Sequence, residues 1–110
     1  MDNRSNERRQ HKRHKLTCPI TLFGRGGQVL VKADTADLSH GGAYVTVDHE
    51  SVKAAKNVNV AFSIPDTGPD HQMEGFAANA TVLRQDYCEN NELIGLALQF
   101  TQHMHLPIEA

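Results

Sequence analysis

The sequence contains no tryptophan, and its two tyrosines and four phenylalanines make up only 5% of the chain. A hydrophobic core must therefore rest on valine, leucine, isoleucine and the few phenylalanines. No apolar run approaches the roughly 20 residues that a membrane-spanning helix requires, so we expect no membrane span. The N-terminal region is charged and lacks the apolar stretch of a signal peptide, which predicts a cytoplasmic protein.

Cysteine is also scarce, and Cys18 and Cys88 do not form a CxxC pair. Isolated cysteines in a cytosolic protein are normally reduced, so we expect free thiols. The sequence shows no nucleophile paired with a base and no carboxylate motif suited to acid–base catalysis. His103 and His105 lack carboxylate or thiolate partners, which disfavours a metal site. We predict a protein that is not an enzyme and holds no metal or cofactor.

The net charge of −2 conceals an uneven distribution. Residues 1–15 carry six basic and two acidic side chains, a local balance of +4, whereas the other 95 residues have a balance of −6. A basic arm attached to a mildly acidic body favours an anionic partner. Because 110 residues leave room for one compact domain, we divide the chain into a flexible arm, 1–15, and a folded domain, 16–110.

The folded part alternates between apolar and polar residues with a period of two, which is the pattern of β-strands. The alternation defines six segments, 16–23, 28–39, 43–47, 58–64, 76–82 and 94–100. In the last segment the apolar positions are Ile94, Leu96, Leu98 and Phe100. The alternation of the second segment breaks midway, which predicts a bulge or bend. Six short strands favour an all-β fold, and closing them into a six-stranded antiparallel barrel would remove exposed edges.

The arm ends in a basic cluster, Arg8-Arg9-Gln10-His11-Lys12-Arg13. A segment this basic repels itself and should stay mobile until an anion offsets its charge. The planar guanidinium of arginine can donate two parallel hydrogen bonds to phosphate oxygens or to guanine, and its face can stack on a base. The alternative is a solvated tail that only keeps the protein in solution.

A second polar cluster, Asp37-Leu38-Ser39-His40-Gly41-Gly42, joins the second and third predicted strands. Asp37 and Ser39 are two residues apart in an extended segment, so their side chains point to the same face. A carboxylate and a hydroxyl there can contact a guanine edge and a phosphate, and Gly42 places no Cβ in the way of a ligand. Alternatively, these polar groups cap their own backbone turn.

Together the two clusters resemble the PilZ domain family. The resemblance rests on an RxxxR motif, Arg9 to Arg13, followed by a DxSxxG motif at Asp37, Ser39 and Gly42. It extends over 7–100 and includes the last predicted strand. The family's fold, a six-stranded antiparallel β-barrel, agrees with the strand count obtained from the alternation alone. The family's usual ligand is the second messenger cyclic di-GMP.

The resemblance implies a role for each motif residue in binding cyclic di-GMP. Arg9 and Arg13 would bind its phosphates and guanine faces. Asp37 would pair with a guanine edge, Ser39 would contact phosphate or guanine, and Gly42 would permit close approach.

Two further features follow from the same resemblance. Arg8, directly before the motif, matches family members that bind a stacked pair of cyclic di-GMP molecules. Many members also carry a C-terminal helix, but here residues 101–110 contain Pro107, so any helix must be short.

We therefore expect a monomeric switch in which cyclic di-GMP bridges the arm and the DxSxxG turn, orders the arm and forms a surface for a downstream protein effector. A nucleic-acid-binding barrel is disfavoured, because it usually needs exposed aromatic platforms and this body is acidic. A nucleotide-independent protein-interaction adaptor is the other alternative, although such family members typically lack the arginines or the DxSxxG residues.

Overall fold

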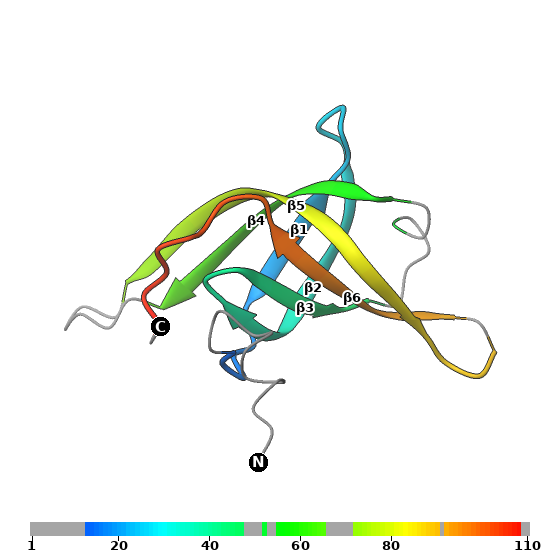
Figure 1. Ribbon diagram of the computed structural model, residues 1–110. Coiled ribbons are helices and arrows are strands. Elements are labelled where there is room, and N and C mark those ends of the chain that lie inside the picture. Colours follow the sequence, from blue (N-terminus) through cyan, green and yellow to red (C-terminus); the bar gives the residue numbers. More distant parts are fainter. Residues whose placement is uncertain (1–12, 48–51, 53–54, 66–71, 91, 109–110) are drawn as a thin grey trace, which may run out of the picture.

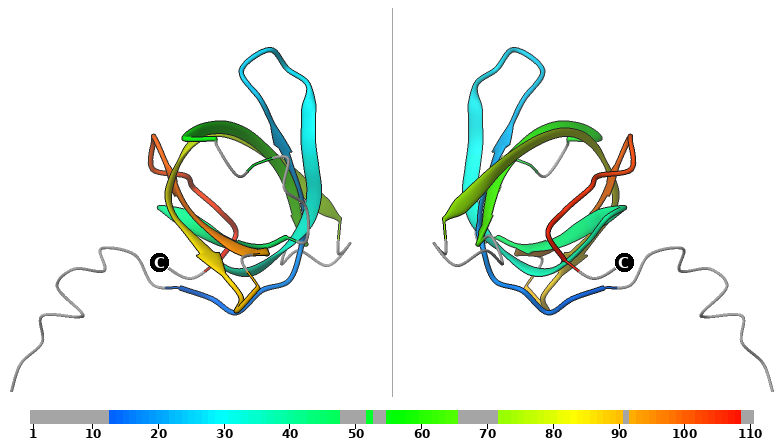
Figure 2. Two further views of the ribbon diagram at one scale, coloured as in Figure 1. Left: turned by 90° about the vertical axis from the view of Figure 1, so that its right-hand side faces the viewer. Right: turned by 90° about the vertical axis from the view of Figure 1, so that its left-hand side faces the viewer.

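The computed structural model describes residues 13–47, 52, 55–65, 72–90 and 92–108. It contains six strands: β1 (Pro19–Phe23), β2 (Val29–Ser39), β3 (Gly42–Thr46), β4 (Asn57–Pro65), β5 (Met73–Tyr87) and β6 (Leu93–Phe100). Every pairing is antiparallel, the strand order is β1-β2-β3-β6-β5-β4, and β4 pairs with β1 to close the barrel. Figure 1 shows the strands from the side and Figure 2 shows the closed ring. The predicted six-stranded antiparallel barrel is confirmed.

Burial follows the predicted alternation along most strands. Cys18, Ile20 and Leu22 are all at most 2% exposed, and the alternate residues of β4 are buried in the same way. The ring of Phe62 stacks on Phe76 and Phe100, with centroid separations of 5.6 Å and 5.8 Å. Such aromatic pairs contribute roughly 0.5–1.5 kcal/mol beyond their buried area. The core is thus mainly aliphatic, and it includes Phe62 and Phe100, against which the partly buried Phe76 packs.

The predicted break in the second strand is a bulge in β2. The register between β2 and β3 shifts between Thr35 and Asp37, which interrupts the alternation there. Thr35 points inward and is 2% exposed, and Leu38 is fully buried. Asp37 and Ser39, on either side of Leu38, therefore lie on the opposite face of the strand from Leu38, although Ser39 is itself only 7% exposed.

The C-terminal end of β5 and the N-terminal end of β6 differ from the prediction. β5 continues to Tyr87 through a register shift between Val82 and Arg84, and Leu83, at this shift, is 61% exposed. A second shift places Leu93 in the core, 3% exposed, and Ile94 outside, 44% exposed. The predicted alternation is therefore wrong at Ile94, since the bulge reverses the phase just before the regular part of β6.

The chain after β6 folds back onto the barrel without forming a helix within 101–108. Thr101 donates its N–H to the carbonyl of Asn79 (2.9 Å), and Leu106 is buried as part of the core. Figure 2 shows this red segment passing over the end of the ring. Among the described residues, no helix has the length and apolar character needed to cross a membrane.

Candidate ligand-binding site

The last residues of the predicted arm lie beside β2. His14 donates its N–H to the carbonyl of Leu38 (2.8 Å) and accepts the N–H of Leu38 (2.9 Å). This isolated bridge sets the neighbouring side chains of the two segments next to each other. The guanidinium of Arg13 lies 3.8 Å from the carboxylate of Asp37, with the two side chains 47% and 24% exposed. The structure thus brings together one residue from each motif.

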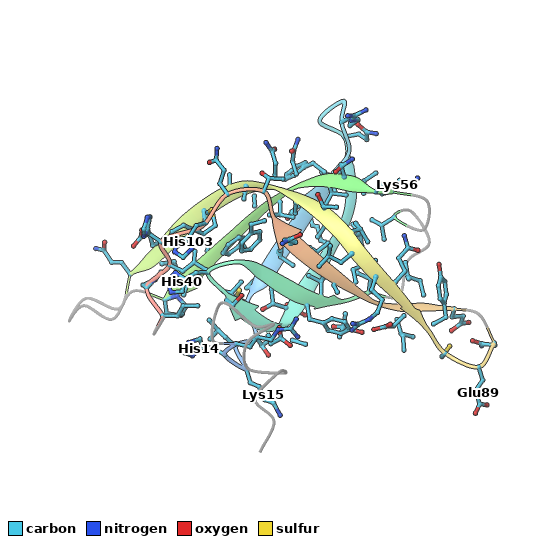
Figure 3. All side chains as sticks on the ribbon, viewed as in Figure 1. His14, Lys15, His40, Lys56, Glu89 and His103 are labelled. Carbon is cyan, nitrogen blue, oxygen red and sulfur yellow. The ribbon has the colours of Figure 1, made fainter. Side chains whose placement is uncertain are left out.

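The other two motif arginines, Arg8 and Arg9, lie outside the described residues. Their placement, and the flexibility of the arm 1–15, stay predictions. Figure 3 shows where the described end of the arm lies, with His14 and Lys15 below the barrel and His40 close by.

Ser39 forms a capped turn with the residues that follow it. Its hydroxyl accepts the N–H groups of Gly41 and Gly42, both at 3.2 Å, and lies 3.3 Å from the carbonyl of Gly42. The side chain is nearly buried, 7% exposed. The predicted alternative, in which this hydroxyl caps its own backbone, therefore describes the structure as it stands. A ligand that contacts Ser39 must share or replace these bonds.

Gly42 lies against the neighbouring strand. It pairs with Ser39 on β2 and with Gln99 on β6. A Cβ on Gly42 would overlap the carbonyl oxygen of Leu98. From the sequence, this glycine is expected to permit the approach of a ligand, and the structure adds a requirement from the barrel itself.

A polar cluster that was not predicted from the sequence lies on the outer face next to Asp37. Tyr44 lies directly opposite Asp37 in the β2–β3 register, and its ring crosses β6 at Gly95, where a Cβ would overlap the phenol oxygen. The hydroxyl of Tyr44 donates to Asp86 on β5 (2.5 Å). Arg84 donates from Nε to the same carboxylate (2.9 Å), and its guanidinium carbon lies 5.9 Å from the centroid of the tyrosine ring.

The electrostatics of this cluster favour one charge state. The hydrogen bond from Tyr44, and then that from Arg84, lowers the pKa of Asp86 below its ordinary value. The same bond to Asp86 raises the pKa of Tyr44, and Asp86 also raises the pKa of Arg84. At neutral pH Tyr44 is therefore a protonated phenol, Asp86 a carboxylate and Arg84 a charged guanidinium.

A sequence signal existed for part of this cluster. Tyr44 follows Gly42 by two residues in a strand, which places both on one face. Arg84 and Asp86 could not be assigned in this way, because the register shift at Leu83 changes the phase of β5.

The family assignment follows from sequence comparison. The sequence profile of the PilZ domain matches residues 7–109. This chain belongs to the PilZ domain family. No curated protein sequence matches it significantly.

Solved structures of other proteins are similar to this PilZ domain. The Bacillus subtilis inhibitor of motility, MotI/DgrA, is 16% identical with a TM-score of 0.69, covering 86% of this chain and 43% of that one. This PilZ domain therefore spans less than half of the MotI structure. The PilZ domain of YcgR from Escherichia coli with c-di-GMP is 17% identical with a TM-score of 0.54, covering 86% and 78% of the two chains. The PilZ domain of CeSA, from a cellulose-synthesising bacterium, is 24% identical with a TM-score of 0.48, covering 78% and 79%.

The groups considered for metal or disulfide chemistry are placed as follows. Cys18 is buried and Cys88 is partly exposed, and both are free thiols. The ring of His103 contacts that of His105 edge-on, with the centroids 5.1 Å apart. In the part of the chain that the structure describes, no three histidine, cysteine or acidic side chains are grouped so that they could hold a metal ion.

Proposed function

We propose that this PilZ domain is a receptor for cyclic di-GMP, which binds between the RxxxR arm and the DxSxxG turn. The observation that carries the proposal is the pairing of His14 with Leu38, because it sets Arg13 beside Asp37. A PilZ domain of the same fold has been solved with cyclic di-GMP. The expected roles are binding and signalling rather than catalysis.

The Arg13–Asp37 ion pair is suited to being opened by an anionic ligand. Exposed ion pairs contribute only about 0–1 kcal/mol, so separating this pair costs little. A phosphate can take over the guanidinium of Arg13 with charge-assisted hydrogen bonds, each worth roughly 1.5–3 kcal/mol. The carboxylate of Asp37 is then free to accept hydrogen bonds from the N–H groups of a guanine edge.

Tyr44 and Arg84 extend this site along the barrel surface. Tyr44 is the cross-strand neighbour of Asp37, and Arg84 lies over its ring. Aromatic and guanidinium faces both stack on nucleobases. In our proposal, a guanine bound by Asp37 lies next to the surface formed by Tyr44 and Arg84.

The signal is carried by the arm. Arg8 and Arg9 join Arg13 in binding the phosphates, and the neutralised arm becomes ordered against the barrel. The ordered arm and the ligand form a new surface that a downstream effector protein recognises. We propose that the receptor itself acts as a monomer.

Calorimetric titration of cyclic di-GMP tests the proposal. The wild type should bind, and the Arg9→Ala/Arg13→Ala double variant should not. Lys56→Gln is the matched control, because Lys56 lies on the opposite side of the barrel from His14 in Figure 3 and its loss should leave binding unchanged. Binding of a stacked ligand pair by the wild type, reduced to single molecules by Arg8→Ala, would support the role of Arg8. No binding by the wild type would reject the receptor and favour the nucleotide-independent adaptor.

A further inference from the structure

A groove with a volume of about 380 Å³ crosses the outer face of β4 and β5. Its floor includes Ala61 and Ala77, which are directly opposite each other in the register of the two strands. Phe23 of β1 lines the groove on the β4 side, and Met104 of the C-terminal segment lines it on the β5 side. Figure 1 shows this segment running beside β5. Side chains from four parts of the chain therefore surround a floor of two methyl groups.

An aromatic ring and two amides form a row at one end of this floor. Asn59 and Asn79 are directly opposite each other in the β4–β5 register, and Phe23 is the partner of Asn59 on β1. Side chains at such positions start roughly 4.5–5.5 Å apart at Cβ, so the three are neighbours. Thr101 follows on the other side, because its N–H and its hydroxyl both donate to the backbone carbonyl of Asn79 (2.9 Å and 3.3 Å).

The two amides have no role within the fold. Asn59 and Asn79 are exposed, and neither side chain forms a hydrogen bond with any residue that the structure describes. Asparagine is depleted in β-strands, so a facing pair within two regular strands runs against local preference. Departures of this kind are expected at functional sites. A ligand accounts for these amides, whereas the packing of the barrel does not.

The lining indicates the chemical class of that ligand. None of the described residues that line this groove is ionisable, although 22% of the whole chain is charged. A side-chain amide donates from its nitrogen and accepts at its oxygen, and a hydroxyl group can also do both. Two adjacent hydroxyls of a ligand therefore match one amide. Phe23 adds an apolar surface for the C–H groups of the same ligand, so the groove suits a neutral ring that carries several hydroxyls.

The dimensions of the groove favour a compact ring over an extended chain. It spans residues 59–61 of β4 and 77–79 of β5, which is roughly 7 Å along the strands. A second hollow of about 320 Å³ continues it toward Asn57 and Arg25, and Asn59, Asn79 and Thr101 line both. The continuation leaves room for a second ring. Small-molecule sites are typically about 300–1,000 Å³, with a few polar groups on an apolar lining.

We propose that this groove is a binding site for a neutral saccharide. One sugar ring packs against Phe23, its hydroxyls exchange hydrogen bonds with Asn59 and Asn79, and the small floor lets it approach the sheet. A second ring extends toward Asn57. The groove shares no residue with the junction of Arg13 and Asp37, so it can be occupied with or without cyclic di-GMP.

Titration of the full chain with three neutral tetrasaccharides, cellotetraose, maltotetraose and chitotetraose, tests the proposal. At least one of them should shift the backbone amide resonances of residues 59–61 and 77–79 in a saturable way and leave that of Val45 unchanged. N-acetyl tetraalanine amide, an uncharged peptide, should cause no such shift. No saturable shift with any of the sugars, or binding of the peptide alone, would overturn the proposal.

Variants assign the binding to the groove. Asn59→Ala and Asn79→Ala should each weaken it about two- to tenfold, the loss expected for one hydrogen bond of ordinary net strength. Ala61→Leu should abolish it by filling the floor while every polar group stays in place. Gln99→Ala is the control, because it removes an exposed amide of β6 that does not line the groove. Unchanged binding by Ala61→Leu would reject the site, as would equal losses in Asn59→Ala and Gln99→Ala.

The saccharide site and the receptor can be tested separately. The Arg9→Ala/Arg13→Ala double variant should bind the tetrasaccharide as the wild type does, and Ala61→Leu should keep the affinity of the wild type for cyclic di-GMP. Competition between the two ligands would contradict a separate site. The wild-type titration maps the contacted amides without any substitution, so it decides the case if a variant fails to fold.

Discussion

Individual residues of the site also serve the barrel, and the two glycines of the outer face show this best. Gly42 leaves room for the carbonyl oxygen of Leu98, and Gly95 leaves room for the ring of Tyr44. Neither requirement comes from backbone conformation, because the positive φ among the described glycines belongs to Gly27. Loss of binding after substitution of Gly42 therefore cannot by itself be assigned to ligand contact.

Gly42→Ala should destabilise the protein. The added methyl group forces β3 and β6 apart, and overpacking of this kind costs roughly 1–3 kcal/mol. Gly75→Ala is the control, because a Cβ there meets nothing closer than the hydroxyl of Ser63 at 4.0 Å. Urea unfolding measures both. Equal stabilities of the two variants would contradict the packing role of Gly42.

Tyr44→Phe should lower stability at neutral pH and have a smaller effect in acid. The folded-state pKa of Asp86 lies below its ordinary value of 3.8, mainly because Tyr44 donates to it. Stability from this bond is therefore complete above 3.8 and is lost as the pH falls through the folded-state pKa. Tyr87→Phe is the comparison, since Tyr87 donates to the neutral amide of Gln85. Urea unfolding at neutral and acid pH measures the difference, and a pH-independent effect of Tyr44→Phe would refute the assignment.

Residues of the candidate site could be predicted from the sequence only where they belong to a motif or to a regular alternation of apolar and polar residues. Asp37, Ser39 and Gly42 could be named as candidates because the DxSxxG motif lies in one short turn. The contacts of His40 could not be predicted, because its ring nitrogens lie against backbone carbonyls of Met104 and Ile108, more than 60 residues away. Contacts of a side chain with distant backbone leave no residue pattern in the sequence.

At the scale of elements, the bulge of β2 connects the arm to the barrel. Thr35 points inward at the bulge, where its hydroxyl accepts the N–H of Cys18 (3.0 Å) and donates to the carbonyl of Leu16 (2.6 Å). These bonds hold the chain before β1 alongside β2. The position of Arg13 beside Asp37 depends on this attachment.

Thr35→Val should therefore weaken both the fold and the attachment of the arm. The substitution keeps the shape of the side chain but leaves the buried N–H of Cys18 and the partly buried carbonyl of Leu16 without this partner, which costs roughly 1–3 kcal/mol. Thr81→Val is the control, because its hydroxyl bond to Asn57 is exposed. Urea unfolding gives the cost, and exchange of the His14 amide reports the attachment. An unaffected His14 amide in a destabilised Thr35→Val protein would separate the two effects and contradict this prediction.

The order and type of the elements were predictable because the fold is built from alternating strands joined by short turns. The bulge in β2 was visible as a break in that alternation. The continuation of β5 to Tyr87 and the outward position of Ile94 were not, because each depends on a register shift against a partner strand. The alternation of apolar and polar residues shows which face of the sheet a residue occupies only until a bulge or register shift interrupts it.

At the scale of the whole molecule, the charges are separated along the chain. The basic residues of 1–15 precede a body with a balance of −6. Of the cations in the arm, Arg13 is placed by the barrel next to Asp37. An anionic ligand at this junction meets attraction from the arm and repulsion from the body, so its affinity depends on screening by salt.

Affinity for cyclic di-GMP should therefore fall as salt concentration rises, and the dependence should be smaller in Arg13→Gln. Arg13 belongs to the site, so removing its charge removes one of the interactions that salt screens. Lys56→Gln removes the same charge on the opposite side of the barrel from His14 (Figure 3) and should leave the slope unchanged, because salt already screens the interaction of a remote exposed charge with the ligand. Calorimetric titrations at several salt concentrations measure the three slopes. Equal slopes for the two variants would mean that net charge, rather than the placement of Arg13, governs binding.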